Sequence, residues 1–295
     1  MSKILKKTKN NVFYICVGVI LGLYVLSMFF MLGWALITTI RPYSEFIGAP
    51  VSLPQKITFQ NWVDTFVKFS IPKTENGITV GYHYMETMFL YSILYAVGCA
   101  LVQTLTGCVC AYLTAKYPFR LGKIVYATVI VVMIIPIVGS LPSEIMMLQN
   151  LGLHDSFIGI YVMKMNFLGM YFLVFYATFK SLSWSYAESA FIDGASHWTV
   201  MTRVMLPLVR TSFLAIFLLN FIVYWNDYQS PMLYLPSFPT VAYGLFYMKF
   251  VSTQSFGKIP MQLTGCIIMC IPSLVLFLIF QEKLMGNLTV GGLKG

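Results

Sequence analysis

Six long apolar segments, separated by polar loops, make up most of the chain. A helix needs about 20 apolar residues to cross the roughly 30 Å hydrocarbon core of a bilayer. The pattern therefore predicts an all-α membrane protein with six transmembrane helices, near Val12–Ile40, Met88–Ala115, Ile124–Leu141, Phe157–Phe179, Phe213–Leu235 and Leu263–Gln281. The first segment is longer than the apolar core of a signal peptide and lacks a small-x-small cleavage site, so we interpret it as a retained span.

The composition supports a membrane protein, since 58% of the residues are hydrophobic and only 10% are charged. The net charge of +9 does not indicate a nucleic-acid partner, because the basic residues form no run beyond Lys3–Lys9. All six cysteines lie in apolar segments and are interpreted as buried packing residues. Cys266 and Cys270, one helical turn apart, leave a metal pair conceivable, but we expect no metal and no cofactor.

The distribution of Lys and Arg predicts the orientation in the membrane. With a cytoplasmic N-terminus, twelve cations fall on the inner side and six on the outer side, where six acids balance them. Both termini are then cytoplasmic. The predicted organisation is a cytoplasmic N-terminus (1–11), a first helix (12–40), an extracytoplasmic loop (41–87), a transmembrane core (88–281) with a cytoplasmic loop at 181–209, and a cytoplasmic tail (282–295).

The outer loop contains one segment with helical spacing of its apolar residues. Phe59, Trp62, Val63, Phe66 and Val67 recur at that spacing, and the preceding Thr58 can cap the helix. Two compatible interpretations remain open. The helix lies in the membrane interface, or it packs on the outer ends of the spans.

Polar side chains at membrane depth usually face a bundle interior or a water-filled path, because facing lipid costs several kcal/mol. Lys164 either donates hydrogen bonds into such a path or snorkels to the outer interface. Amides beside aromatic rings suit a sugar, although interhelical hydrogen bonding with an interfacial Trp is the alternative for residues 225–227. The substrate-path candidates are Gln103, Lys164, Asn166, Asn220, Trp225, Asn226 and Asp227.

A polar insert between the fourth and fifth apolar segments carries the most specific motif. Gly194 permits a turn between two short amphipathic helices, Trp184–Ile192 and Ser196–Met205, and Pro207 bars helix continuation. The insert resembles the cytoplasmic EAA loop of ABC import permeases, which an ATPase subunit grips. Ser189 and Val204 depart from the usual Ala and Ile of that family. The matching positions expected to couple to the ATPase are Glu188, Ser189, Ala190, Asp193, Gly194, Ala195, Leu206 and Pro207.

The resemblance extends over nearly the whole chain. Asp193-Gly194-Ala195 and the cluster at 225–227 resemble the carbohydrate branch of the family, and the C-terminus resembles the tail of the smaller maltose-type permeases. In that class the tail reaches the ATPase dimer, which implies this role for Gly291, Gly292, Lys294 and Gly295. The chain has no complete Walker sequence, since Gly122-Lys123 and Gly257-Lys258 are each followed by Ile. We therefore expect a non-catalytic subunit, with ATP hydrolysis on another chain.

The resemblance implies a carbohydrate importer in the bacterial inner membrane, working by alternating access. The implied partners are a second homologous permease, two copies of an ATPase subunit, an extracytoplasmic solute-binding protein, the sugar and membrane lipid. On the outer side, Tyr243, Phe246 and Tyr247 form an apolar stripe that would contact the binding protein, or only pack as an outer gate helix. The alternatives are a permease for another solute, such as a polyamine, phosphate or glycerol-phosphate, and a secondary transporter. A secondary transporter would need intramembrane carboxylates, for which Asp227 is the one candidate near a span.

Overall fold

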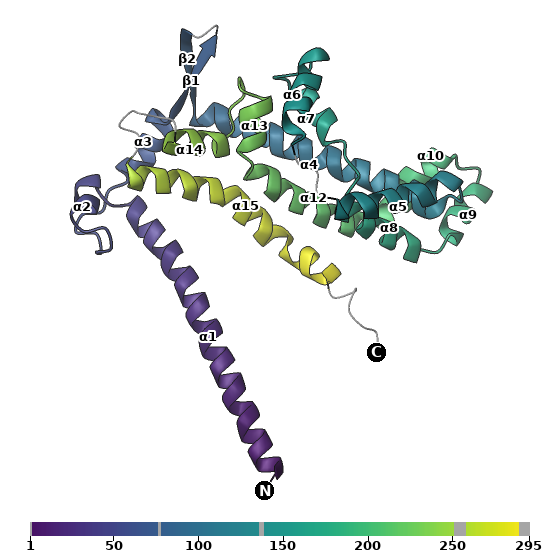
Figure 1. Cartoon of the computed structure of the whole chain (residues 1–295), viewed down its shortest axis with the longest axis horizontal. Helices are drawn as coiled ribbons and strands as arrows, with labels where there is room; N and C mark the ends of the chain where they lie inside the picture. The colour runs from purple at the N-terminus through teal and green to yellow at the C-terminus, as the bar shows by residue number, and fades with distance from the viewer. Residues whose placement is uncertain (1, 76–77, 136–138, 251–257, 289–295) are drawn as a thin grey trace. The chain divides into compact units, whose positions relative to one another are not determined.

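A computed structural model describes residues 2–75, 78–135, 139–250 and 258–288. The chain forms two compact units (Figure 1). Unit 1 comprises Met1–Phe69 and Met248–Ile268, and unit 2 comprises Ser70–Tyr247 and Met269–Gly295. Two helices, α14 (Val241–Phe250) and α15 (Ile259–Leu288), carry the chain across the boundaries between the units.

Unit 1 begins with one long helix, α1 (Ser2–Thr39), followed by α2 (Tyr43–Gly48) and α3 (Gln60–Lys68). From Phe13 onward α1 exposes most of its apolar side chains, as a helix facing lipid or another chain would. The buried Arg41 organises the loop after α1, because its guanidinium donates to the carbonyls of Ala49 (2.8 Å) and Pro50 (3.1 Å). A cation at the last carbonyls of α2 also suits the helix dipole.

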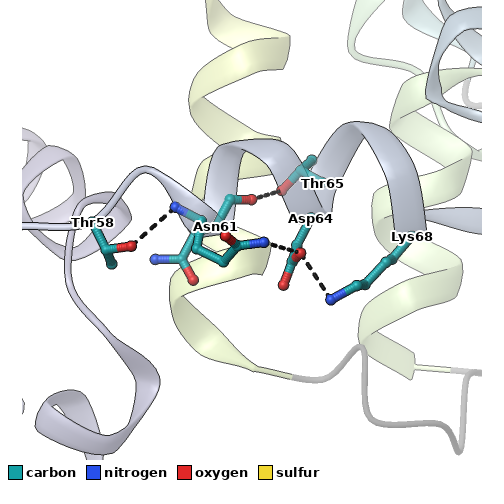
Figure 2. Close-up of polar contacts among 6 residues, drawn as sticks. Thr58, Asn61, Asp64, Thr65 and Lys68 are labelled. Carbon is teal, nitrogen blue, oxygen red and sulfur yellow. Dashed lines mark hydrogen bonds and ion pairs between the residues drawn. The ribbon is translucent and has the colours of Figure 1, made fainter.

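The short helix α3, drawn in Figure 2, forms where the sequence predicted an amphipathic helix. Its N-cap is Phe59, without a side-chain cap, so the expectation that Thr58 caps the helix was wrong. The Thr58 hydroxyl accepts the Gln60 amide proton at 3.2 Å. The polar face of this helix is buried and its apolar face is exposed, the reverse of a helix on the surface of a soluble protein. Thr65 is buried, Asn61 is half-buried and bonded to the end of α1, and Val63, Phe66 and Val67 are exposed. The exposed apolar face is consistent with a helix in the membrane interface.

Unit 2 opens with a β-hairpin, so the expectation of an entirely helical chain was wrong and the fold is mostly helical. Strand β1 (Ser70–Glu75) pairs antiparallel with β2 (Ile78–Tyr84), in a register from Ser70↔Tyr84 to Glu75↔Ile78. The alternation of large apolar residues in β2, at positions 78, 80, 82 and 84, favours a strand rather than the loop we expected.

The central helix of unit 2 is α4 (Met85–Lys116), which packs most extensively against α8 (Met170–Ser181) and α12 (Arg210–Trp225). Small buried residues of α4, including Ala96, Ala100 and Ala111, let neighbouring helices approach closely. Two apolar clusters line this axis, one around Tyr95 and Phe221 and one around Tyr112 and Phe175. The other helices of unit 2 are α5 (Arg120–Ile134), α6 (Leu141–Asn150), α7 (Phe157–Lys164), α9 (Ser185–Ile192), α10 (His197–Thr199), η1 (Val200–Met205), α11 (Leu206–Leu208) and α13 (Gln229–Tyr234).

Three described helices are long and apolar enough to cross a membrane alone: Phe13–Thr39, Met85–Lys116 and Ile259–Gln281. A fourth candidate is a bent pair, His197–Leu208 with Arg210–Trp225, at 77°. The described residues therefore do not form each of the six expected spans as one continuous helix. The third, fourth and fifth apolar segments are interrupted rather than continuous.

Each interruption has a local cause. Ile135 ends α5 in an extended conformation (ψ 117°), as the residue before Pro136 favours. The Asn166 side chain accepts the Leu168 amide proton at 2.7 Å and so competes with helical bonding between α7 and α8. Asp227, two residues before α13, accepts the Ser230 amide proton at 3.0 Å and so competes with helical bonding between α12 and α13.

Candidate functional site

The polar insert forms a helical elbow near the end of α4 opposite the hairpin (Figure 1). Helix α9 ends in a Schellman motif, in which Ala195 N–H donates to Ala190 (2.9 Å) and Gly194 N–H donates to Phe191 (3.0 Å). Gly194 has φ +81°, a left-handed conformation that a β-carbon resists. The two short helices on either side of the turn form as the sequence predicted, α9 before it and α10 with η1 after it.

The second arm of the elbow is a widened helix that accommodates a proline. Ser196 caps it by accepting the Thr199 amide proton at 3.2 Å. In η1 the bonding changes to π-type, so that Leu206 N–H donates to Met201, five residues back. The helix consequently continues through Pro207 and breaks at Val209, where α12 begins. The expectation that Pro207 itself stops the helix was wrong by two residues, because the wider turn relieves the clash that proline causes in an α-helix.

An aromatic cluster fastens the elbow to the end of α4. The Tyr117 hydroxyl lies 2.9 Å from His197 Nδ1, and the Tyr117 ring packs edge-on against Trp184. His197 in turn meets the Phe191 ring at 4.8 Å. Buried Ala187 adds an apolar anchor beneath α9. Both arms of the elbow therefore share one aromatic support at the end of α4.

The outer surface of the elbow combines exposed apolar and acidic side chains. Ile192 is 85% exposed and Trp198 is 70% exposed. Glu188 and Asp193 are also exposed. Exposed large apolar residues rimmed by polar ones are typical of a protein-contact surface. Of the remaining candidates, Ser189 and Pro207 are exposed, and Ala190, Ala195 and Leu206 are half-buried.

Inside unit 2, α4 and α12 share a polar network within an apolar bundle. Asn220 is 3% exposed and donates to the Thr104 hydroxyl at 3.0 Å. One turn further along α12, the Tyr224 hydroxyl donates to Gln103 Oε1 at 2.7 Å. The expected Gln103 and Asn220 thus both belong to the α4–α12 contact.

The network continues toward α13 through Lys164 and Asp227. The Lys164 ammonium lies 5.3 Å from the centre of the Tyr224 ring and 3.4 Å from the Ser230 hydroxyl. The buried Tyr95 hydroxyl donates to Asp227 Oδ2 at 2.8 Å. Lys164 therefore points into the bundle and does not snorkel outward.

Three expected path residues lie outside this network. Trp225 is buried and donates its indole N–H to the Met269 carbonyl at 2.8 Å. Asn226 is exposed and bonds its own helix at the Ile222 carbonyl. Asn166 is exposed and bonds the backbone between α7 and α8. The amides of Asn166 and Asn226 thus bond nearby backbone, whereas the Trp225 indole bonds the backbone of α15.

A family comparison assigns the chain. A model of the family described as "Binding-protein-dependent transport system inner membrane component" matches residues 103–281, which is more than half of the chain and includes the elbow and all of the network except Tyr95. The chain belongs to this family. It is therefore an inner-membrane permease of a binding-protein-dependent ABC importer, the non-catalytic membrane component.

Several curated relatives of the permease align over most of its length. It is 25% identical over 271 residues to the diacetylchitobiose uptake system permease protein NgcG of Streptomyces coelicolor, covering 88% of this chain and 82% of that protein. It is 24% identical to the arabinooligosaccharides transport system permease protein AraQ of Bacillus subtilis, covering 88% of each. It is 22% identical to the maltose/maltodextrin permease protein MalG of Yersinia pestis, covering 92% and 90%.

The fold of the permease matches a solved transporter structure. A chain from the crystal structure of a bacterial ABC transporter involved in the import of the acidic polysaccharide alginate superposes with a TM-score of 0.75. The match covers 93% of this chain and 97% of that chain, at 21% identity.

The outer-side candidates of the permease lie on α14. Phe246 stacks on Tyr228 at 4.5 Å, and Tyr243 packs edge-on against Tyr247. Burial raises the pKa of Tyr243, which keeps its hydroxyl neutral. All three candidates are half-buried. The expected tail residues Gly291, Gly292, Lys294 and Gly295 lie outside the described residues.

Sequence reasoning missed four residues of these two sites. Tyr95, Thr104 and Tyr224 complete the network, and His197 links the elbow to Tyr117. A signal was present, since Tyr95 and Gln103 are two helical turns apart and Asn220 and Tyr224 one turn apart. Each pair shares a helix face, but the sequence does not say that the two faces meet.

Proposed function

We propose that this permease moves a carbohydrate, of oligosaccharide size, across the inner membrane by alternating access. The observation that carries the proposal is the uncharged, aromatic-lined part of the network, in which Gln103 pairs with Tyr224 and Asn220 pairs with Thr104. Such groups bond sugar hydroxyls while the ring packs on an apolar sugar face. The printed substrates of the relatives, diacetylchitobiose, arabinooligosaccharides and maltodextrin, belong to the same chemical class.

The network argues against a polyamine as the solute. A polycation favours several carboxylates, whereas the network contains one, Asp227, which is bonded to Tyr95 and to the Ser230 amide. The ammonium of Lys164 lies 5.3 Å from the centre of the Tyr224 ring and would repel a polyamine. A proton- or sodium-coupled secondary transporter is disfavoured for the same reason.

We further propose that the elbow receives the ATPase. In the orientation that the charge distribution predicts, the cytoplasm would be faced by Glu188, Ser189, Ala190, Asp193, Gly194 and Ala195. Leu206 and Pro207, just before α12, would pass the movement of the elbow on to that helix. Closure of two ATPase subunits would pull on exposed Ile192 and Trp198, and the shared aromatic support would rock α4 and α12 together. This is rigid-body gating between two global states.

The remaining partners follow from this assembly. A second homologous permease would complete the translocation path, and the tail residues Gly291, Gly292, Lys294 and Gly295 would reach the ATPase interface. On the outer side, an extracytoplasmic solute-binding protein would deliver the sugar. Tyr243 and Tyr247 would contact it, and Phe246 would hold α14 against Tyr228.

The proposal is tested by solute uptake into proteoliposomes that contain the full transporter. Gln103→Ala removes the acceptor of the Tyr224 hydroxyl and should lower oligosaccharide uptake about tenfold, equal to about 1.4 kcal/mol. The matched control Asn226→Ala removes only a bond within its own helix and should change uptake less than about twofold. Spermidine uptake equal to oligosaccharide uptake, or equal losses in both variants, would contradict the assignment.

A further inference from the structure

A basic cavity opens where α4 ends and α5 begins, beside α8. Its volume is about 820 Å³, and four cations line it: Lys116, Arg120, Lys123 and Lys180. None of the described residues that line it is acidic. Tyr117 and Trp184 of the elbow's aromatic support also line the cavity, but neither role proposed above uses its four cations.

The geometry leaves the charges of this cavity uncompensated. Lys116 Nζ donates to the Leu182 carbonyl at 2.6 Å, which fixes its ammonium at the wall. Lys180 Nζ lies 6.0 Å from the centre of the Tyr176 ring. Arg120 and Lys123 are exposed, one helical turn apart on α5. Four like charges around one hollow repel one another, so the cavity favours an anion.

The surface beside the cations is apolar. Leu121 and Ile124, each next to one of the α5 cations, are 64% and 59% exposed. Phe119 is 41% exposed at the start of the same helix. A free phosphate would gain nothing from this surface. A molecule with a phosphate head and hydrocarbon chains would use both parts.

We propose that the cavity binds the head group of an anionic phospholipid, with Lys116, Arg120, Lys123 and Lys180 around its phosphate and the acyl chains against Leu121 and Ile124. Basic pockets between membrane helices bind such head groups at the cytoplasmic side. The inference is independent of the transported solute. It depends on the proposed orientation only for which leaflet supplies the lipid. Because lipid binding in detergent does not depend on orientation, the lipid site and the orientation can be disproved separately.

The test is native mass spectrometry of the full chain, purified in detergent with the subunits that copurify, and titrated with phosphatidylglycerol or phosphatidylcholine. Wild type should retain one phosphatidylglycerol selectively. Arg120→Gln with Lys123→Gln should weaken that binding about 30-fold, equal to about 2 kcal/mol for two cations. Both side chains are exposed, so the variant should fold normally, which its melting temperature checks.

The matched control is Arg203→Gln with Arg210→Gln, which removes the same charge from exposed positions outside the cavity. It should bind phosphatidylglycerol as wild type does. Equal retention of the two lipids, or equal loss in both double variants, overturns the proposal. Competition by inorganic phosphate at the same concentration as the lipid would assign the cavity to a free anion and also overturn it.

Discussion

Glu144 and Tyr234 form a short hydrogen bond that joins α6 to α13, with the Tyr234 hydroxyl 2.6 Å from Glu144 Oε2. This bond, and a second one from Ser140, hold the pKa of Glu144 below its usual value of 4.5. A depressed carboxyl pKa stabilises the fold fully above the unfolded value, and the contribution is lost as pH falls through the folded value.

We therefore expect acid to weaken the wild type more than a variant without the bond. Between pH 6 and pH 3 the melting temperature of wild type should fall further than that of Tyr234→Phe, which keeps the ring and removes the donor. Ser237→Ala, nearby but bonded through its backbone amide to Asp155, is the control and should follow wild type. Identical dependence of the melting temperature on pH for wild type and Tyr234→Phe would show that the Glu144–Tyr234 bond does not stabilise the fold.

Single residues also show how far the sequence could be interpreted. Polarity alone identified Gln103, Asn220 and Asp227, because a buried polar group in an apolar helix needs a partner. It could not separate them from Asn166 and Asn226, whose amides are satisfied by nearby backbone. Cysteine burial was predicted for the whole set, yet Cys16, Cys266 and Cys270 are exposed on the described chain, since a membrane helix presents apolar side chains outward.

At the scale of elements, α3 holds the end of α1 through one side chain. The Asn61 amide nitrogen donates to the carbonyls of Thr39 and Arg41, each at 2.8 Å. The side chain of its exposed neighbour Gln60 donates to Asp64 Oδ1 at 2.8 Å, within α3 itself.

Asn61→Ala should therefore lower the free energy of unfolding of unit 1 by about 1–3 kcal/mol, because two buried carbonyls lose their donor. Gln60→Ala should stay within about 0.5 kcal/mol of wild type. Hydrogen exchange at the end of α1 measures the difference. Equal protection in the two variants would show that Asn61 does not hold α1.

Element boundaries were predicted best where local chemistry alone decides them. Gly194 and Ser196 each act within three residues, and the helices that they stop or start were predicted from sequence. The broken fourth and fifth segments were missed because hydropathy averages over Asn166 and Asp227, whose side chains redirect the backbone. The π-turns before Pro207 depend on packing of the whole elbow and have no sequence signal of their own.

For the whole molecule, the charge distribution predicts that the elbow faces the cytoplasm. A cysteine at Ser196 should be protected from an impermeant thiol reagent in sealed right-side-out vesicles, and a cysteine at exposed Lys56 should react. The exposed native Cys16, Cys266 and Cys270 must first be replaced by Ala. Rapid labelling of a cysteine at position 196, with protection of a cysteine at position 56, would show that the protein has the opposite orientation in the membrane.

The central claim is that the elbow transmits ATP hydrolysis to the membrane helices, and Gly194 tests it most directly. The measurement is ATP-driven oligosaccharide uptake by the reconstituted transporter, with copurification of the ATPase as the control for assembly. Gly194→Val places a β-branched residue at φ +81° and should lower uptake at least about tenfold, whereas Gly194→Asn, which tolerates this conformation, should keep most of it. Uptake by an assembled Gly194→Val transporter within about twofold of wild type would contradict the account.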